Sequence, residues 1–343
     1  LVWIGGSVVL LEAAKWLQTG FAGKLHEEDE PDRFLLQLGY ILLLTFVVRH
    51  FMVYIHVEDQ IAGFKVRWLI ELAAFLVLLY WAFQQPALSG KREYPLWSII
   101  QPMMPEILLG FTFGIAIVDV REIWHPLVCV LLALAALFTT FRQSEVISRL
   151  RFYALLFSWA SAASIVYLSR YYIYNTMAWT DQAWLSGLLS MISLFVFVAF
   201  YHPYRQLENI TFPRLISGVM NMFVQLIRQK SMWWIFYPIF IAVAVFLYYS
   251  FSKSVLTLWW VVECFAIFSL AFWARENYFR FIAFAGVLIC LFRLVLFDLA
   301  QTGTLTRALA FLGMGAILLA MYVVGNRFKH RFETTQTAIS KEG

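Results

Sequence analysis

Long apolar runs, each with few charged residues, make up most of this sequence. An α-helix needs about 20 predominantly apolar residues to cross the ~30 Å hydrocarbon core of a bilayer. Hydrophobic residues fill 62% of the 343 positions and charged residues 14%. A water-soluble fold cannot bury so much apolar surface, because too many of its positions face water. We therefore predict an all-α, polytopic integral membrane bundle with spans near 1–18, 35–56, 64–84, 123–141, 150–173, 183–202, 232–251, 255–273, 279–297 and 304–325.

The segment 94–118 does not read as a simple span. Pro95, Pro102 and Pro105 interrupt its first half, and Gly110 and Gly114 loosen its second half. Proline removes a backbone donor and kinks or ends a helix. We expect about ten membrane crossings and, in addition to them, this one kinked or re-entrant segment.

Basic residues in the short loops predict the orientation of the chain. They concentrate at 142–151, 205–230, 275–280 and 327–331, and these regions alternate with loops at 174–182, 252–254 and 298–306 that carry fewer of them. Cytoplasmic loops are enriched in Lys and Arg. Both termini are therefore expected to be cytoplasmic. Eleven spans with an external N-terminus is the alternative.

The stretch 208–230 has the pattern of an amphipathic helix. Apolar residues recur there every three or four positions, Pro213 falls in the first turn, and Arg214 and Arg228 lie on the polar face. We predict an interfacial helix on the inner leaflet; a helix packed against the bundle, or an oligomer contact, is the alternative. With no loop long enough for a separate domain, residues 1–343 are expected to form one transmembrane domain that ends in a basic cytoplasmic tail, 326–343.

Ionisable residues at membrane depth are costly and are therefore candidates for function. Glu263 lies near the middle of its span without a basic residue within one or two turns, so a proton or cation relay and a structural hydrogen bond both stay open. Glu106 follows Pro105 at a helix start, where a broken helix beside an acidic residue can form an ion or substrate site. Glu71 follows Arg67 by four residues, a spacing that favours a structural ion pair, with a relay as the alternative.

Two further groups of charges lie in or beside loops. Asp298 and Arg307 flank a short hairpin, and a bridge between them would tie two adjacent spans together. The acidic run 26–32 follows the first span and is predicted to lie on the outer face. Its residues Glu28, Asp29 and Asp32 are candidate ligands for Mg²⁺ or Ca²⁺, because such cations prefer clustered carboxylates; a solvated charge run is the simpler alternative.

Cofactor motifs are not recognised in the sequence. The histidines near span ends do not pair within one span, which argues against a haem, and there is no nucleotide-binding glycine loop. The cofactor therefore stays unknown. Cys129, Cys264 and Cys290 all lie inside apolar runs and are interpreted as small core residues rather than metal ligands.

The last part of the chain resembles a known family. The residues Arg293-Leu-Val-Leu-Phe-Asp298-Leu, followed by Thr306-Arg307-Ala-Leu-Ala-Phe311-Leu-Gly313-Met-Gly315, resemble the C-terminal hairpin of a bacterial family of multi-pass membrane proteins, domain of unknown function twenty-three thirty-nine. The opening Trp3-Ile4-Gly5-Gly6 is similar to the first span of that family. The resemblance implies a long helical bundle, located in a bacterial cell membrane or another energy-transducing membrane, and no catalytic residues. The chain differs in a shorter middle and in Arg293, where lysine is expected.

Three functions remain open at this point. The first expectation is a scaffold or accessory subunit of a membrane complex. The second is a secondary transporter or channel that uses Glu263 and the broken helix near Glu106, and the third is a lipid-linked transferase that uses the acidic loop; an enzyme is the least favoured class. Expected partners are membrane lipids and other membrane proteins or a second copy of the chain, and nucleic acid is not expected.

Overall fold

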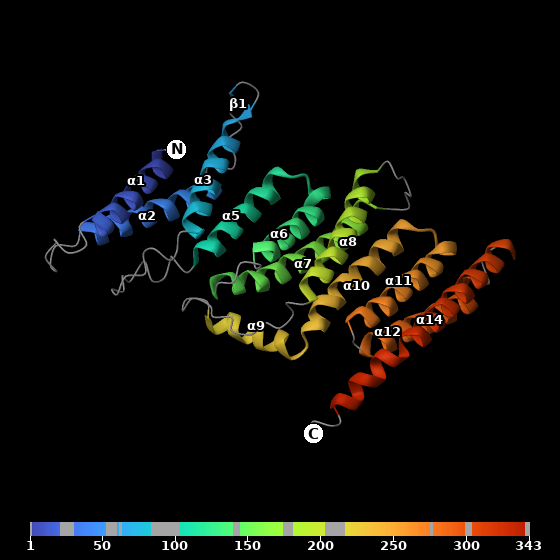
Figure 1. Cartoon of the computed structure of the whole chain (residues 1–343). Coiled ribbons are helices and arrows are strands. Elements are labelled where there is room, and N and C mark those ends of the chain that lie inside the picture. Colours follow the sequence, from blue (N-terminus) through green and yellow to red (C-terminus); the bar gives the residue numbers. More distant parts are fainter. Residues whose placement is uncertain are drawn as a thin grey trace. The chain divides into compact units, whose positions relative to one another are not determined.

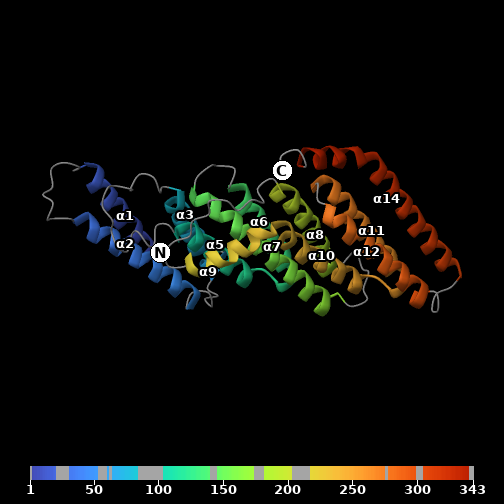
Figure 2. The ribbon, with the colours of Figure 1, turned by 90° about the horizontal axis from the view of Figure 1, so that it is seen from below.

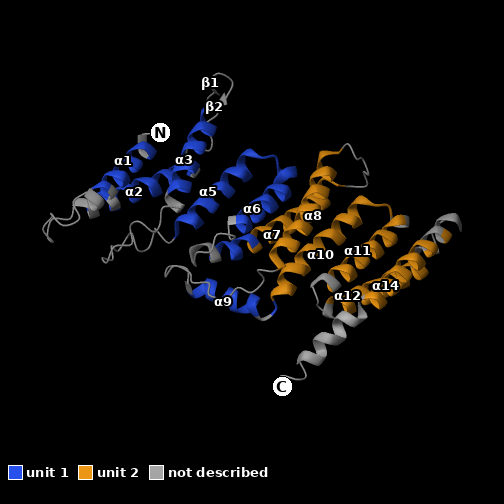
Figure 3. Ribbon diagram, viewed as in Figure 1, with its two compact units in different colours: residues 1–154, 206–230 blue, residues 155–205, 231–343 orange. Residues whose placement is uncertain are grey.

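The computed structural model describes residues 2–20, 31–52, 60–61, 64–83, 103–139, 145–173, 181–202, 217–274, 277–298 and 304–339. Within these ranges the chain forms twelve α-helices and one short hairpin (Figure 1). Contacts group the chain into two compact units, which are described separately (Figure 3). Unit 1 comprises Leu1–Ala154 and Gln206–Lys230, and unit 2 comprises Leu155–Arg205 and Ser231–Gly343.

Unit 1 begins with two helices, α1 and α2, that pack side by side (Figures 1 and 2). Gly39 of α2 makes this close packing possible, because a Cβ there would lie 2.8 Å from Leu11 of α1. The buried core around them includes Leu11, Tyr40 and Phe111. The elements of unit 1 are α1 (Val2–Gly20), α2 (Pro31–Met52), β1 (Gln60–Ile61), β2 (Phe64–Lys65), α3 (Val66–Phe83), α5 (Met104–Asp119), the 3₁₀ turn η4 (Glu122–Trp124), α6 (His125–Thr139), the start of α7 (Glu145–Tyr171) and α9 (Ser217–Gln229). The strands β1 and β2 pair antiparallel, with Gln60 opposite Lys65.

Unit 2 contains the rest of α7 and five further α-helices. Asp181 starts α8 by accepting a hydrogen bond from the Ala183 backbone N–H at 3.0 Å, as N-cap residues do. Helix α14 packs along α11 (Figures 1 and 2). The elements are α8 (Gln182–Tyr201), α10 (Ser231–Ser250), α11 (Lys253–Ala274), α12 (Asn277–Arg293), the π-helical turn η6 (Leu294–Asp298) and α14 (Thr304–Ile339), which continues through much of the basic tail.

A proline inside α10 is compensated by a tryptophan of α7. Pro238 has no backbone N–H, so the carbonyl of Trp234, four residues earlier, loses its usual helical donor. The indole N–H of Trp159 donates to that carbonyl at 2.7 Å. Because water does not reach a lipid-exposed backbone to satisfy it, this side chain stabilises the proline-containing turn.

We expect Trp159→Phe to lower the free energy of unfolding by about 0.5–1.5 kcal/mol, since the Trp234 carbonyl would lose its donor. Pro238→Ala restores a backbone N–H at position 238. Trp159→Phe should therefore cost less in a Pro238→Ala background, and a double-mutant cycle in detergent measures that coupling. Strictly additive losses would show that the indole does not compensate for the proline.

The expectation of about ten spans is wrong. Among the described residues, four helical stretches are long and apolar enough to cross a membrane, namely Arg149–Tyr171, Gln182–Tyr201, Ser231–Ser250 and Phe279–Leu296. Other apolar helical stretches in the described ranges have only 10–17 residues. An apolar run in the sequence can include turns as well as helix. The run 123–141 contains part of η4, so that the helix α6 has only 15 residues. Such a helix is roughly 22 Å long, whereas the hydrocarbon core of a bilayer is about 30 Å thick. The four long helices support a membrane location, and the orientation of the chain stays a prediction.

Two sequence expectations concern segments that the structure describes in part. In 94–118, residues 103–118 are described; α5 begins at Met104, carries Pro105 in its first turn and continues as helix to Asp119. In 208–230, the helix covers Ser217–Gln229. It buries Val224 and Ile227 and exposes Val219, Met222, Phe223 and Leu226. The location of α9 on the inner leaflet remains a prediction.

Candidate functional site

Glu263 lies in α11 with only 8% of its surface exposed. Its neighbours along the helix are apolar, and the residues three, four and seven positions later, Ala266, Ile267 and Leu270, share its face. The Oε1 atom of Glu263 has no hydrogen-bond partner among the described residues. A buried polar atom without a partner is costly, so this carboxyl group is a strong candidate for binding something the chain itself does not supply.

A cavity of about 280 Å³ has Glu263 among its lining residues. Three helices of unit 2 form its walls: Phe195 and Val198 from α8, Phe236, Ile239, Phe240 and Val243 from α10, and Glu263, Ala266, Ile267, Ser269 and Leu270 from α11. The hydroxyl of Ser269 donates to the carbonyl of Phe265 at 2.9 Å. Among the lining residues, Glu263 is therefore the polar side chain left to meet a ligand.

Two cysteines lie near Glu263. Cys264 is the next residue of α11, and its thiol forms a hydrogen bond with that of Cys290 of α12, which also interacts electrostatically with the Glu263 carboxyl group. Gly286 of α12 permits this packing, because a Cβ there would lie 2.6 Å from the Cys264 sulfur. Cys129, Cys264 and Cys290 are all buried.

Glu106 and Arg149 form a second buried group of charges, in unit 1. A guanidinium nitrogen of Arg149 lies 3.1 Å from Glu106 Oε1, and the two side chains are 4% and 11% exposed. Tyr153, one turn after Arg149, lies beside the same carboxylate. Glu106 therefore has a cation next to it, unlike Glu263, and the arrangement is that of an ion pair between α5 and α7.

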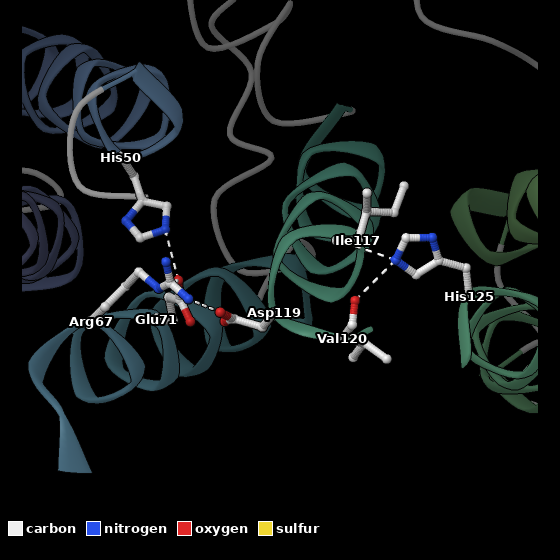
Figure 4. A network of polar contacts seen from close by, with 7 residues as sticks. All are labelled: His50, Arg67, Glu71, Ile117, Asp119, Val120 and His125. Carbon is white, nitrogen blue, oxygen red and sulfur yellow. Dashed lines mark hydrogen bonds and ion pairs between the residues drawn. The ribbon is translucent and has the colours of Figure 1, made fainter. Parts of the chain in front are cut away.

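A network of four charged or titratable side chains joins three helices of unit 1 (Figure 4). Arg67 contacts Glu71 with 3.4 Å between Nε and Oε1, and it also pairs with Asp119 at the end of α5. His50 Nε2 lies 3.2 Å from the same Glu71 oxygen. The imidazole of His50 is fully buried between the rings of Phe46 and Phe111.

The end of α5 has a further polar contact in the same view. His125 Nε2, at the start of α6, lies 3.0 Å from the carbonyl oxygens of both Ile117 and Val120 (Figure 4). The last carbonyls of a helix have no donor within the helix, and a side chain near the C-terminus can supply one. This contact stabilises the turn that follows Asp119.

Sequence reasoning found part of these groups and missed the rest. The spacing of Arg67 and Glu71 indicated their contact. Asp119 and His50 were not assigned as further partners of this pair, and Arg149 was not assigned as the partner of Glu106. All three missed residues lie near helix ends beside apolar runs, and this position was the signal in the sequence that could have identified them. In unit 1, Glu12 accepts a hydrogen bond from the Tyr80 hydroxyl at 2.8 Å.

For the other predicted site residues, the structure does not describe the side chains. Glu28 and Asp29 lie outside the described residues, and the side chain of Asp32 is not described, so the metal site in the acidic loop stays a prediction. The side chains of Asp298 and Arg307 are likewise not described, although their backbones belong to η6 and α14. Among the described side chains there is no group of three or more potential metal ligands.

Comparison with known proteins does not add to this picture. The chain matches no family model, no curated protein and no solved structure. Inferences about function therefore rest on the geometry of the two units.

Proposed function

We propose that this chain is a multi-pass membrane protein that binds a small lipophilic cation in unit 2 and carries it in exchange for a proton. The observation that supports this most directly is that Glu263, which has a buried oxygen without a hydrogen-bond partner, lines an apolar cavity of about 280 Å³. Cavities for small ligands are typically apolar with a few placed polar groups, and this volume is close to the lower end of their ~300–1,000 Å³ range. We also propose membership of the bacterial family that the C-terminal residues resemble.

The chemistry of the cavity selects the class of ligand. An ionised carboxylate in an apolar site gains from a bound cation, and the aromatic walls Phe195, Phe236 and Phe240 favour a cation with an apolar body. When the cation leaves, one proton can take its place on the carboxylate, so the exchange moves one positive charge in each direction. Two of the three walls, α8 and α10, are candidate membrane spans, which places the cavity among helices suited to lipid.

Uptake of radiolabelled tetraethylammonium into proteoliposomes with an acidic interior tests this proposal. We expect saturable uptake by the wild type and a loss of at least about tenfold for Glu263→Gln. Removing one partner of a buried charge pair costs about 2–5 kcal/mol, and 1.4 kcal/mol is tenfold. Glu12→Gln makes the same chemical change in unit 1 and should transport at the wild-type rate.

Two results would overturn the proposal. Uptake by the wild type no greater than that of empty liposomes would favour the scaffold or accessory-subunit function that the sequence first suggested. Equal uptake by the wild type and Glu263→Gln would show that this carboxyl group does not bind the cation. A melting curve for each variant shows whether a loss of uptake comes from loss of fold.

A further inference from the structure

A second hollow in unit 2 is an open groove of about 480 Å³, formed by α7, α10 and α11. We call it the α10 groove. It is open to the surface, since Arg170 is exposed and Tyr248 and Ile241 are each about half exposed. It is distinct from the Glu263 cavity, and the two share Phe240 as a lining residue. Both α7 and α10 are candidate membrane spans, so lipid is the natural surrounding of this surface.

The α10 groove has one polar end and one apolar end. Arg170 lies in the last turn of α7, and Tyr248 and Tyr249 lie in the last turn of α10. The rest of the floor is aliphatic and follows one face of α10, at Ile241, Ala244 and Val245. A cation and two phenol groups therefore lie at a helix end, where the edge of the membrane is expected, and the aliphatic surface runs from there towards its interior.

The polar end is held in place by contacts around Trp260. Its indole N–H donates to the carbonyl of Ala244 at 3.2 Å, and its ring stacks on Tyr248 with 6.5 Å between centroids. The guanidinium of Arg293 lies over the same ring, 4.5 Å from its centre. This end of unit 2 therefore carries two arginines, Arg170 on α7 and Arg293 against the Trp260 ring. The contacts of Trp260 hold the aromatic side chains of this positively charged region in position.

We propose that the α10 groove binds one anionic phospholipid, with its phosphate at Arg170 and Tyr248 and an acyl chain along Ile241, Ala244 and Val245. Arginine binds phosphate through several N–H donors at once, and Tyr and Trp favour the headgroup level. The two arginines near this end favour a headgroup with net negative charge over a zwitterionic one. Free phosphate would leave the aliphatic floor uncovered, so a lipid of the surrounding bilayer fits the whole groove better.

Native mass spectrometry of the full-length, delipidated protein tests this inference with added phosphatidylglycerol. We expect one tightly bound phosphatidylglycerol, at least tenfold weaker binding of phosphatidylcholine, and at least tenfold weaker binding of phosphatidylglycerol by Arg170→Gln. Arg121→Gln, which changes an exposed arginine of unit 1 outside α9, should bind phosphatidylglycerol like the wild type. Ala244→Leu fills the floor and should also weaken binding while leaving Arg170 in place.

Four outcomes would overturn the assignment. If Arg170→Gln binds phosphatidylglycerol as tightly as the wild type, the headgroup is not at this arginine. Competition by millimolar inorganic phosphate would indicate an ion site, and equal binding of diacylglycerol would indicate a surface that recognises acyl chains alone. A delipidated protein that dimerises, with dimerisation lost in Ala244→Leu, would indicate a second copy as the occupant. Arg170 is exposed, so the variant is expected to fold, and its melting temperature checks this.

Discussion

Arg149→Leu is expected to lower the free energy of unfolding by about 3–5 kcal/mol, the usual cost of removing one partner from a buried ion pair. The reason is that Glu106 would keep its carboxylate between α5 and α7 without the guanidinium that now lies 3.1 Å away. The double variant Glu106→Leu/Arg149→Leu should recover most of this loss, because apolar side chains of similar volume can replace a buried pair at little cost. Reversible unfolding in mixed micelles, followed by circular dichroism, measures all three proteins.

A matched control separates this effect from a general effect of losing an arginine. Arg121 lies in the same unit and is exposed, so Arg121→Leu should change the free energy of unfolding by no more than about 0.5 kcal/mol. If the double variant is as unstable as Arg149→Leu alone, the loss comes from packing rather than from the unpaired Glu106, and the ion-pair explanation fails.

Arg67→Leu is expected to have a comparable effect, again about 3–5 kcal/mol. Arg67 is the cation that lies between two carboxylates from different helices, Glu71 of α3 and Asp119 of α5, and it is only 7% exposed. Its removal leaves two negative groups near each other in a buried site. Arg67→Lys keeps the positive charge but replaces the planar guanidinium, which pairs with two carboxylates at once, with a compact ammonium group. Its free energy of unfolding should therefore lie between those of the wild type and Arg67→Leu.

The role of His50 provides an internal check on this second prediction. His50 contacts Glu71 and lies between the rings of Phe46 and Phe111, and a phenylalanine would keep these ring contacts, so His50→Phe should cost much less than Arg67→Leu. The same unfolding assay compares the two variants. A loss below about 1 kcal/mol for Arg67→Leu would contradict the view that this network holds the ends of α2, α3 and α5 together.

Much of the helical architecture could be predicted, because helix formation depends mainly on local sequence. The runs 183–202 and 232–251 correspond within one residue at each end to α8, Gln182–Tyr201, and α10, Ser231–Ser250. The number of spans could not be predicted this way. Hydropathy averages over turns such as η4, whereas crossing a membrane requires an unbroken helix of sufficient length.

The candidate site was predicted only in part. Glu263 was singled out because its span carries no nearby basic residue, and that local fact matches a carboxyl oxygen without a hydrogen-bond partner. The cavity beside it could not be predicted, since its walls come from α8 and α10, whose apolar faces look in sequence like any lipid-facing or core-facing surface. The α10 groove was missed for the same reason: Arg170, Tyr248 and Trp260 come from three different helices.

The sequence by itself determined that the chain is helical, strongly apolar and poor in charged residues, because these properties follow from residue type and from spacing within single helices. Only the tertiary structure decided what each buried charge meets. Glu106 and Asp119 acquire arginines 43 and 52 positions away along the chain, while Glu263 lines a cavity. Such pairings depend on which helices pack together, and in apolar helices that choice is made by the fit of side chains across the interface rather than by any pattern along one of them.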